Sequence, residues 1–145
     1  MIPSRQQLAI VLALFVSGCS LGGDGGWGPL AVLESDGYDL ARTEGTIRIT
    51  DTCVLLENGD EVALLVWPAD RTRWNASDGT IEFETLSGRT VTLASGQRVA
   101  LGGGGWSAAE ASNPDHEALL AGIDWISAPD PACPTDTWWG VGEVL

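Results

Sequence analysis

Few residues in this sequence could act in catalysis, and none of them lies in a known catalytic pattern. The only histidine, His116, stands between two acids in a predicted surface helix. No Gly-x-Ser-x-Gly motif supplies a serine nucleophile to pair with it. Glu82 and Glu84 are two residues apart on a predicted strand, so they share one face. That face is opposite the apolar residues of the strand and is expected to be solvent-exposed. We therefore predict no catalytic residues.

The sequence also contains no complete motif for binding a metal or a cofactor. We therefore predict no bound metal and no cofactor. The acids of the turn 58–61 and of the segment 115–124 do not complete a calcium-binding loop. The glycine run Gly102–Gly105 lacks the Lys-Ser/Thr ending of a phosphate-binding loop. Zinc prefers four ligands, and two free thiolates with one histidine do not supply them.

The first 18 residues have the organisation of an export signal. A polar start containing Arg5 is followed by an unbroken apolar run, Leu8–Val16, and then by the small residues Ser17 and Gly18. This run is too short to cross a bilayer as a helix, which needs about 20 residues. A positive start, a short apolar run and small residues in this order are typical of a secretory signal.

Val16-Ser17-Gly18-Cys19 resembles the lipobox of bacterial lipoproteins. The resemblance is confined to the end of the signal segment. It implies that the Cys19 thiol carries a diacylglycerol, that the preceding peptide is removed, and that the new amine is often acylated as well. Two or three acyl chains anchor a protein almost permanently. The resemblance therefore predicts an exported protein that is held on a bacterial membrane by lipid on Cys19 and faces the periplasm or the cell surface.

Two cysteines remain once Cys19 is set aside for lipid, namely Cys53 and Cys133. In an exported protein, two remaining cysteines most simply form a disulfide bond. Closing a loop of this length stabilises the folded state by ~4 kcal/mol in the chain-entropy description. Thiol redox catalysis is not indicated, because the sequence contains no Cys-x-x-Cys motif.

The chain divides into three parts, with residues 1–18 as the signal peptide, 19–29 as a lipidated flexible tether and 30–145 as a single domain. The tether is rich in glycine, which disfavours regular packing. There is no lysine, and seven arginines stand against 20 acidic residues, for a net charge of −13. Such a surface repels phosphate backbones, so no nucleic-acid partner is expected. The charge favours solubility, with a cationic partner as the more specific alternative.

Strand signals dominate the predicted domain and are separated by tight turns. Apolar residues alternate or run continuously, and glycine turns such as Asn58-Gly59 and Ser95-Gly96 lie between them. Regular structure is expected to end at Gly102–Gly105, and a short helix is expected near 114–121. The predicted strands are 46–50, 53–56, 62–67, 80–85, 90–93 and 99–101, with a closing strand at 138–145.

We predict an all-β fold, a small five- or six-stranded antiparallel meander that closes into an OB-like barrel. Closure would remove the exposed edges that a meander otherwise leaves. The apolar strand with Cys53 and the late Cys133-Pro134 loosely resemble small exported bacterial β-barrel proteins of unknown function. That resemblance implies no activity.

Tryptophan is the unusual residue type, with seven copies against one tyrosine and two phenylalanines. Trp67 and Trp125 are expected in the core. Trp106, Trp138 and Trp139 are the candidate ligand-binding residues, because an outward indole near a barrel mouth can stack on a sugar, a peptide or a partner. The competing interpretation, favoured because tryptophan is usually buried, is that they close the barrel end. Adjacent strand residues such as Trp138 and Trp139 point to opposite faces.

Three functions agree with these features. The first is a non-enzymatic, membrane-tethered binding or interaction domain of the cell envelope, whose partner is an envelope protein or a glycan and which is itself a monomer. The second is an envelope hydrolase that uses a carboxylate pair or a metal, and it requires facing acids with perturbed pKa values in a cleft. The third is a small inhibitor or accessory subunit.

Overall fold

The computed structural model describes residues 26–34, 39, 41–107 and 121–145. The predicted signal, Cys19, His116 and, apart from Ala121, the predicted helix near 114–121 lie outside these residues. Ten strands form in the described part. They are β1 (Ala31–Leu33), β2 (Ala41–Ile49), β3 (Val54–Asn58), β4 (Glu61–Pro68), β5 (Thr72–Asn75), β6 (Thr80–Glu84), β7 (Thr90–Leu93), β8 (Arg98–Ser107), β9 (Trp125–Ser127) and β10 (Thr137–Val144).

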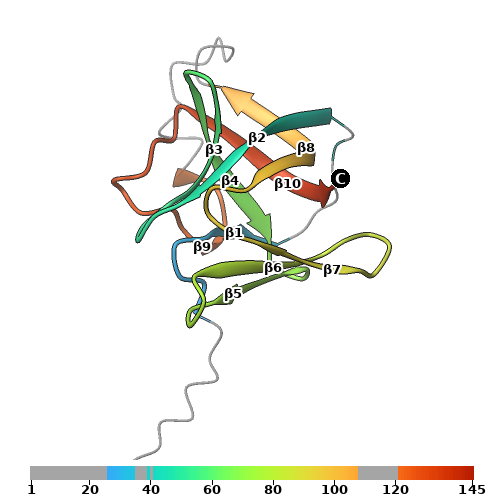
Figure 1. The fold of residues 1–145 in the computed structure, drawn as a ribbon. Coiled ribbons are helices and arrows are strands. Elements are labelled where there is room, and N and C mark those ends of the chain that lie inside the picture. Colours follow the sequence, from blue (N-terminus) through green and yellow to red (C-terminus); the bar gives the residue numbers. More distant parts are fainter. Residues whose placement is uncertain (1–25, 35–38, 40, 108–120) are drawn as a thin grey trace, which may run out of the picture.

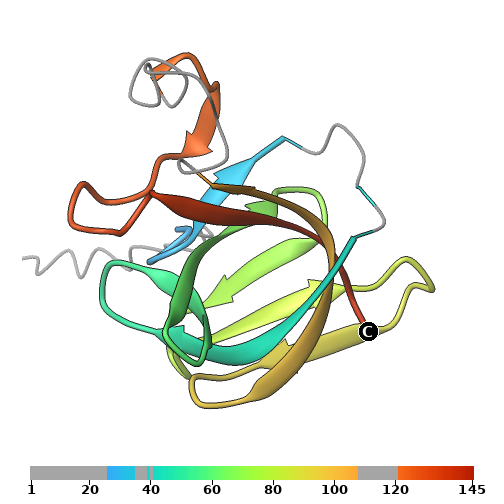
Figure 2. The same ribbon diagram turned by 90° about the horizontal axis from the view of Figure 1, so that it is seen from above.

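Five of these strands close into a barrel, in the order β10-β8-β2-β3-β4, with β4 pairing back onto β10 (Figure 2). The neighbours within this ring are antiparallel except at the closing pair, where β10 runs parallel to β4 from Trp138↔Leu64 to Gly140↔Val66. The predicted OB-like barrel is thus confirmed. It differs from a plain meander because its last strand returns across the barrel to close it.

The other strands extend or cap this barrel. β1 pairs in parallel with the end of β4, and β9 pairs antiparallel with β1. β5, β6 and β7 form a separate antiparallel sheet, which we call the end sheet, and it lies across one end of the barrel (Figure 1). The tip of the β3–β4 hairpin lies at the opposite end (Figure 1). One end of the barrel is therefore covered by a sheet, and the other is its mouth.

The core fills the barrel and the space above the end sheet. Strand alternation sends Ile47, Leu65 and Leu101 inward, and Ile81 and Phe83 meet them from the end sheet. Trp67 is fully buried there, as predicted, and packs edge-on against Phe83 with ring centroids 6.0 Å apart. This shared cluster makes the barrel and the end sheet one packing unit.

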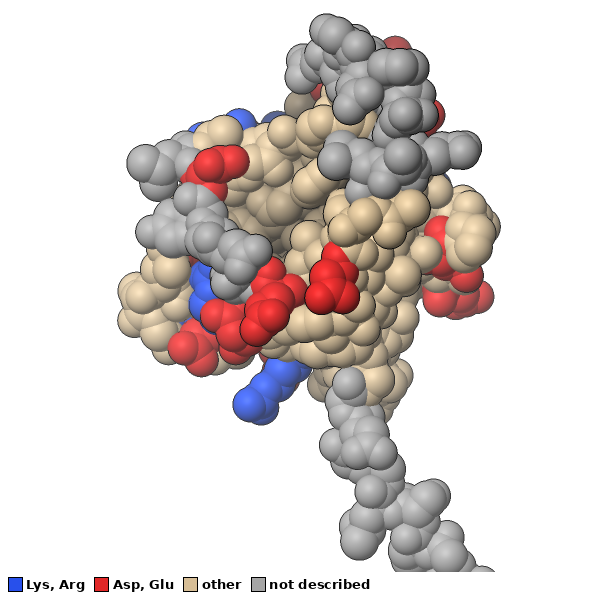
Figure 3. Space-filling view, turned by 180° about the vertical axis from the view of Figure 1, so that it is seen from behind, with Lys and Arg blue, Asp and Glu red and all other residues tan. Residues whose placement is uncertain are grey.

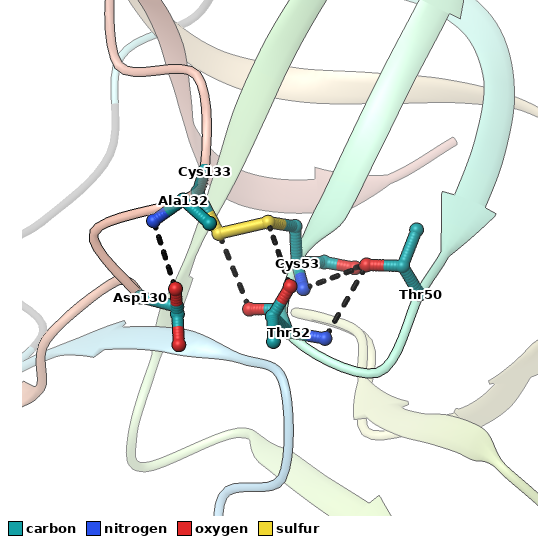
Figure 4. Close-up of a disulfide and its surroundings, with 6 residues drawn as sticks. All are labelled: Thr50, Thr52, Cys53, Asp130, Ala132 and Cys133. Carbon is teal, nitrogen blue, oxygen red and sulfur yellow. Dashed lines mark hydrogen bonds between the residues drawn. A yellow bond between two sulfur atoms is a disulfide. The ribbon is translucent and has the colours of Figure 1, made fainter.

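A second buried cluster lies outside the barrel around the predicted disulfide, which is confirmed. Cys53 and Cys133 are bonded, with their Cα atoms 5.8 Å apart. The Thr50 hydroxyl accepts the Cys53 N–H at 2.9 Å, and the Asp130 carboxylate accepts the Ala132 N–H at 2.8 Å (Figure 4). Each cysteine therefore lies in a turn that is stabilised by a hydrogen bond from the backbone to a nearby side chain.

Two local predictions were wrong. Gly102–Gly105 does not end regular structure but continues β8, which pairs with β10 on one side and β2 on the other. Ser95-Gly96 does form a turn, and Gly96 adopts a φ of 86°. The flanking strands β7 and β8 do not pair, however, because the turn passes the chain from the end sheet to the barrel. Among the described residues, no helix is long and apolar enough to span a bilayer.

Candidate ligand site at the barrel mouth

A pocket of about 770 Å³ opens at the mouth of the barrel. Its wall is formed by the β3–β4 hairpin tip, the end of β8, the start of β10 and the segment before β10. We call it the mouth pocket. The residues that matter below are Asp60, Glu61, Trp106, Asp136, Trp138 and Trp139, all of which line it.

Trp139 lies at the inner side of this pocket. It points into the barrel, where it is half-buried against the core cluster. Its indole lies against the inward face of β8, since a Cβ on Gly105 would come within 2.7 Å of Trp139 Cε3 and one on Gly103 within 2.9 Å of Trp139 Nε1. The glycine run in β8 therefore makes room for this indole. Trp139 closes the barrel interior from the mouth side, as the competing interpretation of the sequence proposed.

Trp106 and Trp138 lie on the outer face of the barrel as a pair. They are opposite each other in the β8–β10 register, with ring centroids 6.2 Å apart and ring planes at 36°. Trp138 packs against the outer disulfide cluster, whereas its neighbour Trp139 packs against the barrel core. The predicted opposite orientation of these two adjacent residues is thus confirmed. Both members of the outer pair remain half-buried.

The outer pair also borders a smaller groove of about 360 Å³, which we call the outer groove. Gly104 and Gly140 lie opposite each other in the strand pairing next to Trp106 and Trp138, and both line this groove. The Asp39 carboxylate lies over Gly104. Because both hollows share Gly105, Trp106 and Trp138, the mouth pocket and the outer groove adjoin at the tryptophan pair.

Acidic side chains line the mouth pocket without a basic side chain among the lining residues. Asp60, Glu61 and Asp136 are exposed at its rim, and no arginine lines it. Among the described residues the ion pairs join Arg42 to Glu44, Arg48 to Glu57 and Arg98 to Glu44. The rim carboxylates therefore form no ion pair within the described part of the chain. Figure 3 shows another group of acidic side chains, which lies below a hollow on the side of the end sheet.

Glu82 and Glu84, the carboxylates that the sequence placed on one strand, do not form the facing pair in a cleft that a hydrolase needs. Glu84 is exposed on β6 and Glu82 half-buried, while Ile81 and Phe83 of the same strand are fully buried, as the alternation predicted. The Arg42 guanidinium donates a hydrogen bond to Glu44 and holds the pKa of that exposed carboxyl below its ordinary value. A general acid requires the opposite shift. Within the described residues, no group of three His, Cys, Asp or Glu side chains could hold a metal ion.

Comparison with known proteins adds no family to this picture, since no family model, curated protein or solved structure matches the chain. The site therefore has to be interpreted from its own geometry. The structure brings the three predicted tryptophans together at one pocket. Sequence reasoning considered Asp60 and Glu61 only as calcium ligands, and it missed Asp136. Their signal was weak, because acids beside turns are ordinary.

Proposed function

We propose that this protein is an exported lipoprotein, anchored by lipid on Cys19, whose barrel is a non-enzymatic binding domain of the cell envelope. In this proposal the mouth pocket is the ligand site, and Trp106, Trp138 and Trp139 are its main contact residues. The partner is a component of the envelope, and the domain acts as a monomer. The disulfide suits an oxidising compartment outside the cytoplasm.

The observation that carries the proposal is the convergence of three tryptophans on one open pocket. They come from β8 and β10, and Trp106 and Trp138 are half-buried on the outer face. Tryptophan is enriched at binding hot spots, because one rigid ring buries a large area at little entropic cost. The opposite end of the barrel is covered by the end sheet, and the mouth pocket lies at the other end.

A photo-crosslinking experiment in intact cells tests the binding role. A benzophenone side chain is placed at Asn58, an exposed residue lining the mouth pocket, and in a second variant at Thr92, an exposed residue of the end sheet. We expect one discrete adduct from Asn58 and none from Thr92, and we expect Trp106→Leu to abolish the Asn58 adduct. Equal adducts from both positions, or none from Asn58, would contradict a binding site at the mouth.

Metabolic labelling with a palmitate analogue tests the anchor. We expect the wild-type chain to incorporate the label and Cys19→Ala to lose it. Label retained in Cys19→Ala would overturn the lipoprotein assignment while leaving the binding role open.

A further inference from the structure

We propose that the mouth pocket recognises a cationic side chain, the guanidinium of arginine or the ammonium of lysine, carried by a basic segment of a partner protein. This inference rests on the proposed binding function and names its ligand class. The mouth pocket accepts the cationic group, and the adjoining outer groove accommodates the chain that carries it.

The first support is the size and lining of the pocket. At about 770 Å³ it is larger than a single ordered water or ion needs. Its aromatic part comes from Trp106, Trp138 and Trp139, and a cation near the face of an indole is attracted by the ring quadrupole. Guanidinium groups also stack on such rings, because they are planar and weakly hydrated.

The second support is charge complementarity. Asp60, Glu61 and Asp136 line the same pocket from the hairpin tip and from the segment before β10, without an arginine among the lining residues. The whole chain carries a net charge of −13 and no lysine, so no lysine ammonium of its own competes for the pocket. The negative electrostatic potential of these carboxylates attracts a cationic ligand, which also gains charge-assisted hydrogen bonds to them. A neutral sugar gains little from this potential, and an anionic polymer is repelled by it.

The third support is the adjoining outer groove, which favours a chain over a free small cation. Gly140 presents bare backbone there, the Asp39 carboxylate lies over Gly104, and Val66 and Pro68 of β4 form an apolar wall. An extended peptide can lie close to such a surface, whereas a free small cation would leave it unused. The groove meets the mouth pocket at Trp106 and Trp138, which places chain and cationic group in adjoining spaces.

Binding of defined probes to the full chain in non-ionic detergent tests the proposal, with tryptophan emission and NMR line shifts as readouts. The probes are acetyl-Gly-Arg-Gly-Arg-Gly-amide, its citrulline counterpart, which is neutral but nearly the same shape, glucosamine, and an N-acetylglucosamine oligomer. We expect the arginine peptide to bind about tenfold more tightly than the citrulline peptide. We also expect its affinity to fall when salt is added, because salt screens the attraction between the charges.

Matched variants locate the effect. A triple variant removes the charges of the rim carboxylates and carries Asp60→Asn, Glu61→Gln and Asp136→Asn. We expect it to bind the arginine peptide about tenfold more weakly than the wild type does. The control carries Asp51→Asn, Asp70→Asn and Glu84→Gln, three exposed acids that do not line the mouth pocket, and should bind like the wild type. Trp106→Leu should weaken binding while circular dichroism shows that the fold is retained.

Several results would overturn the inference. Equal binding of the citrulline peptide, or equal weakening in the control variant, would show that cation recognition at the mouth is wrong. Tighter binding of glucosamine than of the peptide would assign the pocket to an amino sugar. Trp106-dependent binding of the N-acetylglucosamine oligomer alone would refute the cationic ligand but support the proposed binding function. Absence of probe binding together with no Asn58 adduct would refute both.

Discussion

At the scale of single residues, the glycines of β8 are best explained by the large side chains beside them. Gly103 and Gly105 face inward beneath the Trp139 indole, and Gly104 faces the Asp39 carboxylate on the outside. Gly103 also adopts a φ of 153°, and a Cβ there would overlap the Gly140 carbonyl. The run is therefore a strand whose side chains are absent because neighbouring groups occupy their space.

Replacing Gly105 by alanine tests this explanation. The new Cβ would lie 2.7 Å from Trp139 Cε3 and 3.0 Å from Cζ3, two atoms of a rigid ring. We expect a loss of about 1–3 kcal/mol in the free energy of unfolding, the usual cost of overpacking. Urea denaturation followed by circular dichroism measures it.

The matched control is Gly104→Ala in the same strand. Its Cβ would meet the end of the Asp39 side chain, which can move away at little cost. Trp139→Leu should relieve part of the Gly105→Ala penalty in the double variant. Equal losses for Gly104→Ala and Gly105→Ala would show that the indole does not set the requirement for glycine.

At the scale of elements, strands were predictable where burial alternates and unpredictable where tertiary packing decides. Ile81 and Phe83 defined β6 because the end sheet has one buried and one exposed face. β8 was cut short at Gly102, because glycine is unfavourable in strands and the sequence does not show that Trp139 lies across it. The pairing of β4 with β10 is long-range and parallel, so no turn between them marks it.

The candidate site was predictable to the same degree. Trp106, Trp138 and Trp139 stood out by residue type, and their opposite faces followed from strand geometry. Asp60 and Glu61 joined them only through the closure of the barrel, which brings the β3–β4 hairpin beside the start of β10. Residue type thus identified the aromatic part of the pocket, and topology supplied the acidic rim.

Arg71 fastens the end sheet to the barrel. It stands just before β5, and its Nη2 donates to the Gly142 carbonyl of β10 at 2.7 Å while its guanidinium lies 5.0 Å from the Phe83 ring centroid. We expect Arg71→Met to lower the free energy of unfolding by about 1–3 kcal/mol, because a charge-assisted hydrogen bond is lost and the buried acceptor is left unpaired.

Arg73→Met is the control, because Arg73 is exposed in β5 two residues after Arg71 and should change stability by less than about 0.5 kcal/mol. Hydrogen exchange adds a local readout, with faster exchange expected in β5 to β7 of the Arg71 variant. A uniform increase over the whole barrel would show instead that the end sheet and barrel open as one unit.

The disulfide acts between elements as well. It joins the start of β3 to the segment before β10, which carries Asp136 to the mouth pocket. The double variant Cys53→Ser, Cys133→Ser should have a free energy of unfolding about 2–5 kcal/mol lower than that of the wild type. The reason is that its unfolded chain regains the conformational freedom of a long loop. Thermal unfolding of this variant and of the reduced wild type should agree. An unchanged melting temperature would mean that the outer cluster holds this segment without the bond.

At the scale of the whole molecule, the chain enters the domain at one end and presents its pocket at the other. Trp27 packs against the core cluster and lines a hollow with Arg71 and Arg73 beside the end sheet. The Trp74 indole of β5 lies directly over Gly28. The β3–β4 hairpin tip, with the mouth pocket, is at the far end of the barrel (Figure 1).

If Cys19 carries lipid as proposed, this polarity predicts how the protein is oriented on a membrane. With lipid on Cys19, residues 20–26 reach at most about 25 Å, so the end sheet stays near the bilayer and the mouth faces away from it. A fluorescent amino acid at Ala76, exposed in the β5–β6 turn, should be quenched by nitroxide-labelled lipids in vesicles more strongly than one at Asn58. The Cys19→Ala chain should show no quenching at either position. Equal quenching at Ala76 and Asn58 would mean that the domain lies on its side. Stronger quenching at Asn58 would mean that the mouth pocket faces the lipid. In that orientation a basic segment of another envelope protein could not reach the pocket.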